Sequence, residues 1–276
     1  MGTQTTKVFI FGGNSSLATE VRKFLVREEI HVLSYARSSN QSLIQVTNYS
    51  APAREISFGD TVIIFFAISS PRACEINPEA SFAVNVTATN EVIREILRRG
   101  GNVVFISSDV VYGNTTNVVT EMSPINPTGR YGIQKSLVEE TWGGFKGFIA
   151  IRTSFNLSNN NGIVKKFLSG DQTTVLKNLH RNVLLTSDLS ALIHQILMMP
   201  NIRWPQALNA GGNELIDIAD YFTSMAKKMG YVGLQIVDWD SIDKACKPNR
   251  IEMDSSLACS ILNRPFESIH SFVPTL

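Results

Sequence analysis

Residues 7–18 read KVFIFGGNSSLA, and this stretch decides the fold. The run from Lys7 to Phe11 predicts a short strand, which turns tightly at the two glycines that follow it. A helix comes next, with an apolar face made of Leu17, Val21, Phe24 and Leu25. Because backbone N–H groups at such a helix start can receive a pyrophosphate, strand, turn and helix together predict a dinucleotide-binding fold.

The turn departs from the usual glycine pattern at one position. Where Gly-x-x-Gly-x-x-Gly is typical, this chain has Gly12, Ser15 and Ala18. Alanine is tolerated at the third position, where helix and strand approach, but serine replaces the bare backbone that brings a phosphate close. A serine hydroxyl could donate to the phosphate instead. We therefore expect the cofactor to contact Gly12, Asn14, Ser15, Ser16 and Leu17.

A second predicted strand ends in hydroxyl groups. Residues 103–113 read VVFISSDVVYG, in which an apolar, β-branched run predicts a buried parallel strand. The strand ends at Ser107 and Ser108, and open α/β sheets bind ligands at the carboxyl ends of their strands. A turn or helix-cap role is the alternative for these two serines. A loop containing Pro124 and Pro127 separates the strand from the next helix.

Tyr131 and Lys135 carry the strongest chemical signal. Their spacing places both side chains on one face of a helix. A phenol with a pKa near ~10, beside a cation that stabilises the phenolate, can protonate a carbonyl oxygen or deprotonate an alcohol. Such a pair is common on surface helices, but here it follows the dinucleotide turn and the strand-end serines in order.

The order of elements predicts the architecture. Strand and helix patterns alternate through about residue 155, which predicts an α/β fold with a doubly wound parallel sheet of the Rossmann type. We expect residues 1–155 to form the dinucleotide-binding domain. Residues 156–276 should form mostly a smaller substrate lobe, interleaved with returning Rossmann elements. In that part the patterns predict a loop over the active site at 156–162, helices over 162–168, 187–199 and 214–229, strands near 173–176 and 207–209, and an irregular tail.

The composition argues against several kinds of partner. The 276 residues carry a formal net charge of +1 without a basic run, so neither nucleic acid nor a membrane surface is expected. Cys74, Cys246 and Cys259 form neither a metal spacing nor an even disulfide set, so we expect no metal site. No apolar signal segment precedes the first strand, and the apolar run at 61–68 has strand length. These features predict a cytoplasmic protein.

Together these segments resemble the extended short-chain dehydrogenase/reductase family. The closest likeness is to its sugar-nucleotide branch, with the dTDP-4-dehydrorhamnose reductases and the UDP-galactose 4-epimerases. The resemblance covers nearly the whole chain. It rests on Gly12–Ala18, Phe65–Ala67, Asn85–Thr89, Ser107–Gly113, Glu121–Lys135, Ile151–Asn156, Arg181–Ser190 and Lys247-Pro248.

The resemblance implies roles for the matching residues. Tyr131 would be the catalytic acid or base, Lys135 would steer its pKa and hold the nicotinamide ribose, and Ser108 would bond the substrate oxygen. Further cofactor contacts are implied for Ala67, Ile68, Thr153 and Ser154. Substrate contacts are implied for Asp109, Val110, Phe155, Asn156, Lys247 and Arg181, the last as a bidentate ligand of the diphosphate. A homodimer through the helices bearing Asn85 and Tyr131 is also implied.

The strand predicted within residues 30–39, the next along the chain after the glycine turn, indicates which dinucleotide is used. NAD selectivity normally comes from an acidic residue at its end. Residues 30–39 read IHVLSYARSS and contain no carboxylate. Arg37 and the neighbouring serines would suit a 2′-phosphate, so we expect NADP(H) as the preferred cofactor and NAD(H) as the alternative.

The resemblance also implies a reaction, the NADP(H)-dependent reduction of a 4-keto group on a nucleotide-activated deoxysugar for a cell-surface polysaccharide. A 4,6-dehydratase would need a second acid after Asp109, where Val110 stands, and a 3,5-epimerase/reductase would need an added Cys/His pair. Two alternatives stay open. One is an NAD-dependent nucleotide-sugar 4-epimerase, which needs only the Ser/Tyr/Lys set. The other is a non-catalytic, cofactor-binding regulatory subunit, which the serine in the glycine turn would suit.

Overall fold

The computed structural model describes residues 7–37, 44–45, 48–238 and 248–275. Among these residues the largest sheet has seven strands in the order β10-β6-β5-β4-β1-β2-β3, all paired in parallel. The strands are β1 (Val8–Phe11), β2 (Val32–Ala36), β3 (Ile44–Gln45), β4 (Thr61–Ile64), β5 (Asn102–Ser108), β6 (Phe148–Thr153) and β10 (Ala207–Ala210). The predicted doubly wound sheet is confirmed. Its order reverses between β1 and β4, the switch point where such sheets bind ligands.

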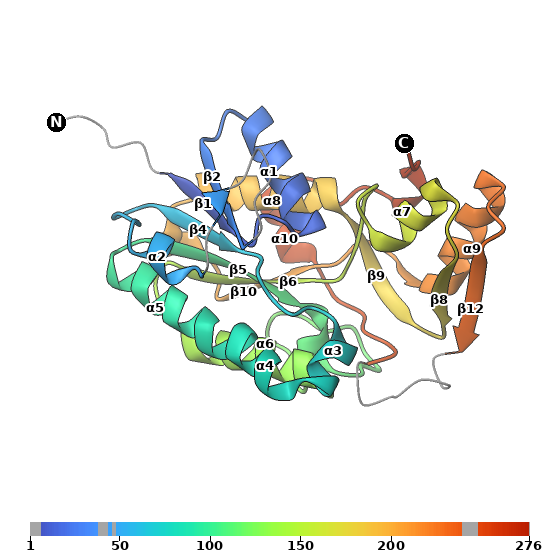
Figure 1. Ribbon diagram of the computed structural model, residues 1–276, viewed down its shortest axis with the longest axis horizontal. Helices are drawn as coiled ribbons and strands as arrows, with labels where there is room; N and C mark the ends of the chain where they lie inside the picture. Colours follow the sequence, from blue (N-terminus) through green and yellow to red (C-terminus); the bar gives the residue numbers. More distant parts are fainter. Residues whose placement is uncertain (1–6, 38–43, 46–47, 239–247, 276) are drawn as a thin grey trace.

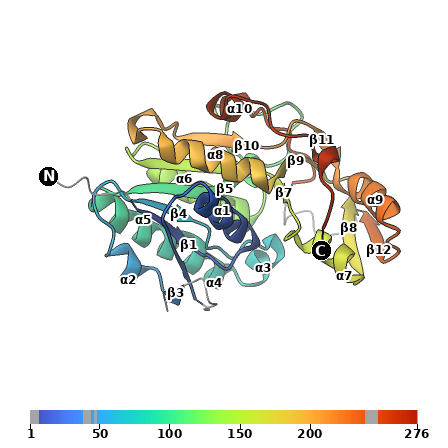
Figure 2. The ribbon, with the colours of Figure 1, turned by 90° about the horizontal axis from the view of Figure 1, so that it is seen from above.

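Helices cover both faces of this sheet (Figures 1 and 2). One face packs against α1 (Ser16–Arg27), α8 (Thr186–Met198) and α10 (Ser256–Leu262). The other packs against α2 (Ser50–Ala53), α5 (Thr89–Arg98) and α6 (Arg130–Trp142). Between β4 and α5 the chain runs through α3 (Pro71–Ile76), α4 (Pro78–Phe82) and a π-helical segment, η1 (Ala83–Ala88).

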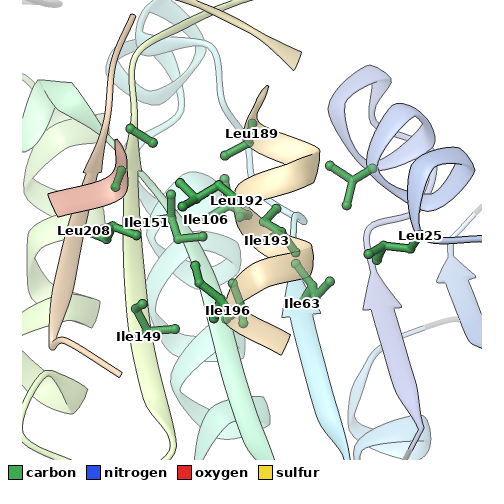
Figure 3. Close-up of a cluster of buried hydrophobic side chains, with 14 of the residues drawn as sticks. Leu25, Ile63, Ile106, Ile149, Ile151, Leu189, Leu192, Ile193, Ile196 and Leu208 are labelled. Atoms are coloured by element: carbon green, nitrogen blue, oxygen red, sulfur yellow. The ribbon is translucent and has the colours of Figure 1, made fainter. Parts of the chain in front are cut away.

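The core explains why the central strands are apolar throughout. Figure 3 shows Leu189, Leu192, Ile193 and Ile196 of α8 facing Ile63, Ile106, Ile149 and Ile151 of β4, β5 and β6. Intervening residues such as Val62 and Phe105 pack on the opposite side. Because successive strand residues point to opposite faces, a sheet covered on both sides needs continuous apolar strands. Burying each such side chain stabilises the folded protein by roughly 1.5–3 kcal/mol.

A smaller lobe lies at one end of the molecule (Figure 1). It contains a three-stranded sheet of β7 (Phe155–Leu157), β9 (His180–Leu185) and β11 (Leu215–Asp217), and a two-stranded sheet of β8 (Thr173–Lys177) and β12 (Leu234–Asp238). The helices α7 (Gly162–Ser169) and α9 (Ile218–Met229) pack on these strands. Short 3₁₀ turns are η2 (Asp109–Tyr112), η3 (Asn201–Arg203) and η5 (Ile269–Ser271).

Several predicted elements of the second half are found, and three expectations differ from the structure. The strand expected near 207–209 is β10, which pairs with β6 in the large sheet. The helix expected over 214–229 begins only at Ile218, because Leu215–Asp217 pair with β9 and the Asp217 carboxylate accepts the N–H groups that begin α9. The tail is not irregular. It contains β12, which pairs with β8, and α10, which packs on α8.

The predicted loop over 156–162 is also shorter than expected. Its first residues belong to β7, and its last begins α7. Within the described part of the chain, no helix combines the length and the apolar character that crossing a membrane requires.

Candidate active site

The first turn of α6 packs directly against η2, the turn that follows Ser108. Gly132 permits this approach, because a Cβ at that position would lie 2.8 Å from the Val110 carbonyl oxygen and 3.0 Å from the Pro127 side chain. Tyr131 therefore stands on a helix that meets the carboxyl end of β5. The predicted catalytic residues come from two adjoining elements at the ligand-binding edge of the sheet.

Lys135 is held at the strand end by its ammonium group. Its side chain is buried, and Nζ donates to the Ile106 carbonyl oxygen at 2.7 Å. Nζ also lies 4.3 Å from the centre of the Phe105 ring and 5.8 Å from that of Tyr131. Burial lowers the pKa of Lys135 to about 8, while the neighbouring Glu139 carboxylate opposes that change. Much of the ammonium charge is thus kept near neutral pH.

Tyr131 stays a protonated phenol. Burial raises its pKa above the ordinary value, and the negative charge of Asp109 adds to the effect. The implied role of Lys135 in steering this pKa stays a prediction, because it applies beside a bound nicotinamide. A neutral phenol is the form that can give a proton to a carbonyl oxygen.

Asp109 joins Ser108, the predicted catalytic serine, to a buried arginine. Its carboxylate accepts the Ser108 hydroxyl at 3.0 Å and the Ser154 hydroxyl at 2.8 Å, and it lies 3.2 Å from Arg181 Nε. The other guanidinium nitrogens of Arg181 donate to the carbonyl oxygens of His180 and Pro248. The structure thus brings Ser108, Asp109, Ser154 and Arg181 together, whereas sequence reasoning gave no sign of this pairing. The role of Arg181 as a diphosphate ligand stays a prediction.

The expected dinucleotide site contains a cavity of about 470 Å³ at the switch point. A smaller cavity of about 170 Å³ shares several of its residues and extends toward η1 and α5. Together they are lined by Gly12, Asn14, Ser15, Ala36, Arg37, Asn48, Tyr49, Ser50, Phe65, Phe66, Ala67, Val84, Ala88 and Val92. The rings of Tyr49 and Phe66 are stacked, with their centres 4.4 Å apart. The sequence did not predict Tyr49 as a lining residue, because it belongs to no motif.

The glycine turn fits a dinucleotide despite its serine. Gly12 has φ +92°, and a Cβ there would lie 2.4 Å from the Phe66 backbone nitrogen, so only glycine lets the turn after β1 approach the backbone after β4 this closely. The Ser15 hydroxyl accepts the Ala18 N–H at 3.1 Å and caps α1. Serine here starts the helix on whose first turn Ser16 and Leu17 lie, and that helix N-terminus is suited to a pyrophosphate.

Asn85 connects the segment that follows β4 to α6. Its side chain accepts the Ile68 N–H at 2.7 Å and donates to the Ile68 carbonyl at 3.0 Å and to Gln134 Oε1 at 2.8 Å. Asn85 lies in η1, and π-helical turns often mark functional sites. Cys74 lies beside the same group, with Sγ 3.2 Å from the Ile68 carbonyl oxygen, although no motif contains it.

The remaining predicted residues lie on either side of this centre. Thr153 donates to Asn156 at 3.1 Å, and Asn156 donates back to the Ser154 carbonyl at 2.9 Å. The Phe155 ring packs against Phe222 of the lobe, and Val110 is partly buried in η2. Lys247, like the serines after Arg37, lies outside the described residues. Over the described ranges, no cluster of three or more His, Cys, Asp or Glu side chains could hold a metal ion.

Comparisons with known proteins agree with this geometry. A dTDP-glucose 4,6-dehydratase of Mycobacterium tuberculosis (strain CDC 1551 / Oshkosh) is 30% identical over 141 residues, 48% of this chain and 42% of that protein. The match thus spans less than half of the curated relative. A structure of MoeE5 in complex with UDP-glucuronic acid and NAD superposes with a TM-score of 0.81 at 18% identity, over 95% of this chain and 94% of that one.

A hypothetical dTDP-4-dehydrorhamnose reductase from Sulfolobus tokodaii superposes with a TM-score of 0.79 at 21% identity, over 96% of this chain and 97% of that one. These likenesses show the fold. A family model described as the RmlD substrate binding domain matches residues 6–198. The chain therefore belongs to the family of the RmlD substrate binding domain.

Proposed function

We propose that the protein is an NADP(H)-dependent reductase of the 4-keto group of a nucleotide-activated deoxysugar, working in the cytoplasm on sugars for a cell-surface polysaccharide. One observation supports this above all others. Tyr131 and Lys135 stand on α6, which packs against the carboxyl end of β5 where Ser108 lies, on the edge of the sheet that also bears the dinucleotide cavity. Family membership and the nucleotide sugar and NAD named for MoeE5 support the same class of substrate and cofactor.

The chain's own residues would handle the proton. The bound nicotinamide supplies a hydride for the carbonyl carbon. Tyr131 gives its proton to the carbonyl oxygen, so that no free alkoxide has to form, and its raised pKa keeps it in the acid form beforehand. The Lys135 ammonium then stabilises the phenolate. Ser108, whose hydroxyl donates to Asp109 in the structure, would turn this one proton to the substrate oxygen.

Arg37 supports a preference for NADP(H). It follows the end of β2 and lines both dinucleotide cavities, where an NAD-specific site would have a carboxylate. A guanidinium there can form charge-assisted hydrogen bonds to a 2′-phosphate.

The proposed enzyme is a homodimer. The helical side of the molecule that carries Asn85 and Tyr131 exposes large apolar side chains, among them Phe82 at 45% and Ile133 at 43%. Burying these residues against a second copy would remove them from water. Sedimentation of the purified protein tests this, since a monomer at micromolar concentration would contradict it.

The reaction is tested with a panel of UDP-, dTDP- and GDP-linked sugars, with 4-keto and 4-hydroxy members. Consumption of added NADPH with one 4-keto sugar, faster than with NADH, is the expected result. Turnover of a 4-hydroxy sugar with co-purified NAD and no added cofactor would instead identify a 4-epimerase. Failure to bind either dinucleotide by calorimetry would point to the non-catalytic subunit.

A further inference from the structure

We propose that Glu139 and Arg152 form a positioning pair that fixes α6 against the end of β5 and so holds Tyr131 and Lys135 in register with Ser108. The inference rests on the proposed function and adds two residues to it. Neither residue touches the expected substrate or cofactor positions, and both act through their neighbours.

Two side chains one helical turn apart attach α6 to β5. Lys135 Nζ donates to the carbonyl oxygen of Ile106 at 2.7 Å. Glu139 Oε1 accepts the hydroxyl of Ser107. Ile106 and Ser107 are consecutive and directly precede Ser108. The helix therefore cannot slide or rotate against the strand end without losing both contacts, and Tyr131, on the same face, would move with it.

Arg152 of β6 extends this attachment beyond the helix. Its Nε donates to Glu139 Oε2 at 2.8 Å, and its Nη2 lies 2.7 Å from the same oxygen. Its Nη1 donates to the Tyr112 hydroxyl at 2.7 Å, which in turn donates to Asn209 Oδ1 at 2.7 Å. Tyr112 belongs to η2 and Asn209 to β10. The pair therefore ties the catalytic helix to both the turn after Ser108 and the neighbouring strands.

Stability alone does not explain a charge pair in this place. The Arg152 and Glu139 side chains are only 6% and 5% exposed. A buried ion pair is often no more stabilising than apolar residues of the same volume, because both charges lose their hydration. What the pair supplies and apolar residues would not is directional bonding to Ser107 and Tyr112. The Glu139 charge also opposes the loss of the Lys135 proton.

The experiment compares two variants with a matched control. Glu139→Gln keeps the shape but removes one charge. Glu139→Leu combined with Arg152→Leu removes both charges, which avoids an unpaired buried ion. Glu140→Gln changes the adjacent, exposed residue of the same helix. For the two variants of the pair we expect kcat to fall between about tenfold and hundredfold. KM for the nucleotide ketosugar and Kd for the dinucleotide should stay near wild type, and the control should change nothing.

Other outcomes overturn the proposal. A double variant with wild-type kcat does so. So does one in which kcat and Tm fall while KM and Kd rise together, because the loss of a purely structural pair would behave in that way. A crystal structure of the double variant reports the register without any substrate, and we expect the Lys135–Ile106 hydrogen bond to be lost. If the wild type reduces no ketosugar, the proposed function fails, and this crystal structure still decides the positioning role, with an intact bond contradicting it.

Discussion

The Asp109 carboxylate lies 3.2 Å from Arg181 Nε, and both side chains are almost fully buried. The same carboxylate accepts the Ser108 hydroxyl, so one anion links the predicted catalytic hydroxyl to the arginine predicted for the diphosphate. Glu75 and Arg130 form an ion pair of similar length, 3.0 Å, at a more exposed place. The two pairs allow a direct comparison of burial.

Asp109→Asn should lower the free energy of unfolding by about 3–5 kcal/mol, because it leaves Arg181 as an unpaired buried cation. Glu75→Gln should cost no more than about 1 kcal/mol, since solvent screens its partner. Urea denaturation measures both. If both variants lost the same small amount of free energy of unfolding, the buried pair would stabilise the fold no more than the exposed pair does.

Gly12→Ala should both destabilise the protein and abolish dinucleotide binding. The left-handed φ of +92° and a Cβ 2.4 Å from the Phe66 nitrogen force the backbone to move, at about 1–3 kcal/mol for the strain alone. Gly170→Ala is the matched control, because its φ is +79° with no atom within 4 Å of the added Cβ. It should lose some stability yet keep the wild-type dinucleotide Kd in calorimetry. Unchanged binding by Gly12→Ala would mean that the cofactor lies elsewhere.

Arg37→Ala should weaken the binding of NADPH but not that of NADH. The Kd for NADPH should rise between about tenfold and hundredfold, because a hydrogen bond to a charged group contributes ~1.5–3 kcal/mol. The Kd for NADH should hardly change. Arg27→Ala, an exposed arginine at the end of α1, serves as the control for general charge. Equal weakening of both cofactors would contradict a 2′-phosphate contact.

The reaction should slow in mildly alkaline solution. Burial lowers the pKa of Lys135 to about 8, so its charge is complete below that pH and is lost as the pH rises through it. In the unfolded chain Lys135 keeps its proton to a higher pH. Between the pKa of the folded protein and that of the unfolded chain, the free energy of unfolding therefore rises with pH. Unfolding does not explain the slower reaction. A kcat/KM profile that stays flat up to the ordinary lysine pKa near ~10.4 would exclude the ammonium from the mechanism.

Local patterns were enough to predict the frame of the site. The spacing of Tyr131 and Lys135 and the serines at the end of β5 depend only on helix and strand periodicity, and the parallel sheet follows from alternating elements. The ion pairs could not be predicted in this way. Glu139 meets Arg152 only because β6 pairs beside β5, and Asp109 meets Arg181 only because β9 of the smaller lobe reaches the turn after β5.

The same reason explains two other features that the sequence patterns did not predict. The pairing of β12 with β8 joins residues about sixty positions apart, so the tail was expected to be irregular. The raised pKa of Tyr131 comes from burial and from Asp109, and neither appears in the spacing of the motif.

Single-turnover reduction of the 4-keto nucleotide sugar by Tyr131→Phe tests the central claim most directly. The variant lacks only the hydroxyl that should protonate the carbonyl oxygen, so the rate of hydride transfer should fall by about 10²–10⁴-fold while the Kd values for NADPH and the sugar nucleotide stay near wild type. A variant that reduces the ketosugar at close to the wild-type rate would contradict Tyr131 as the acid.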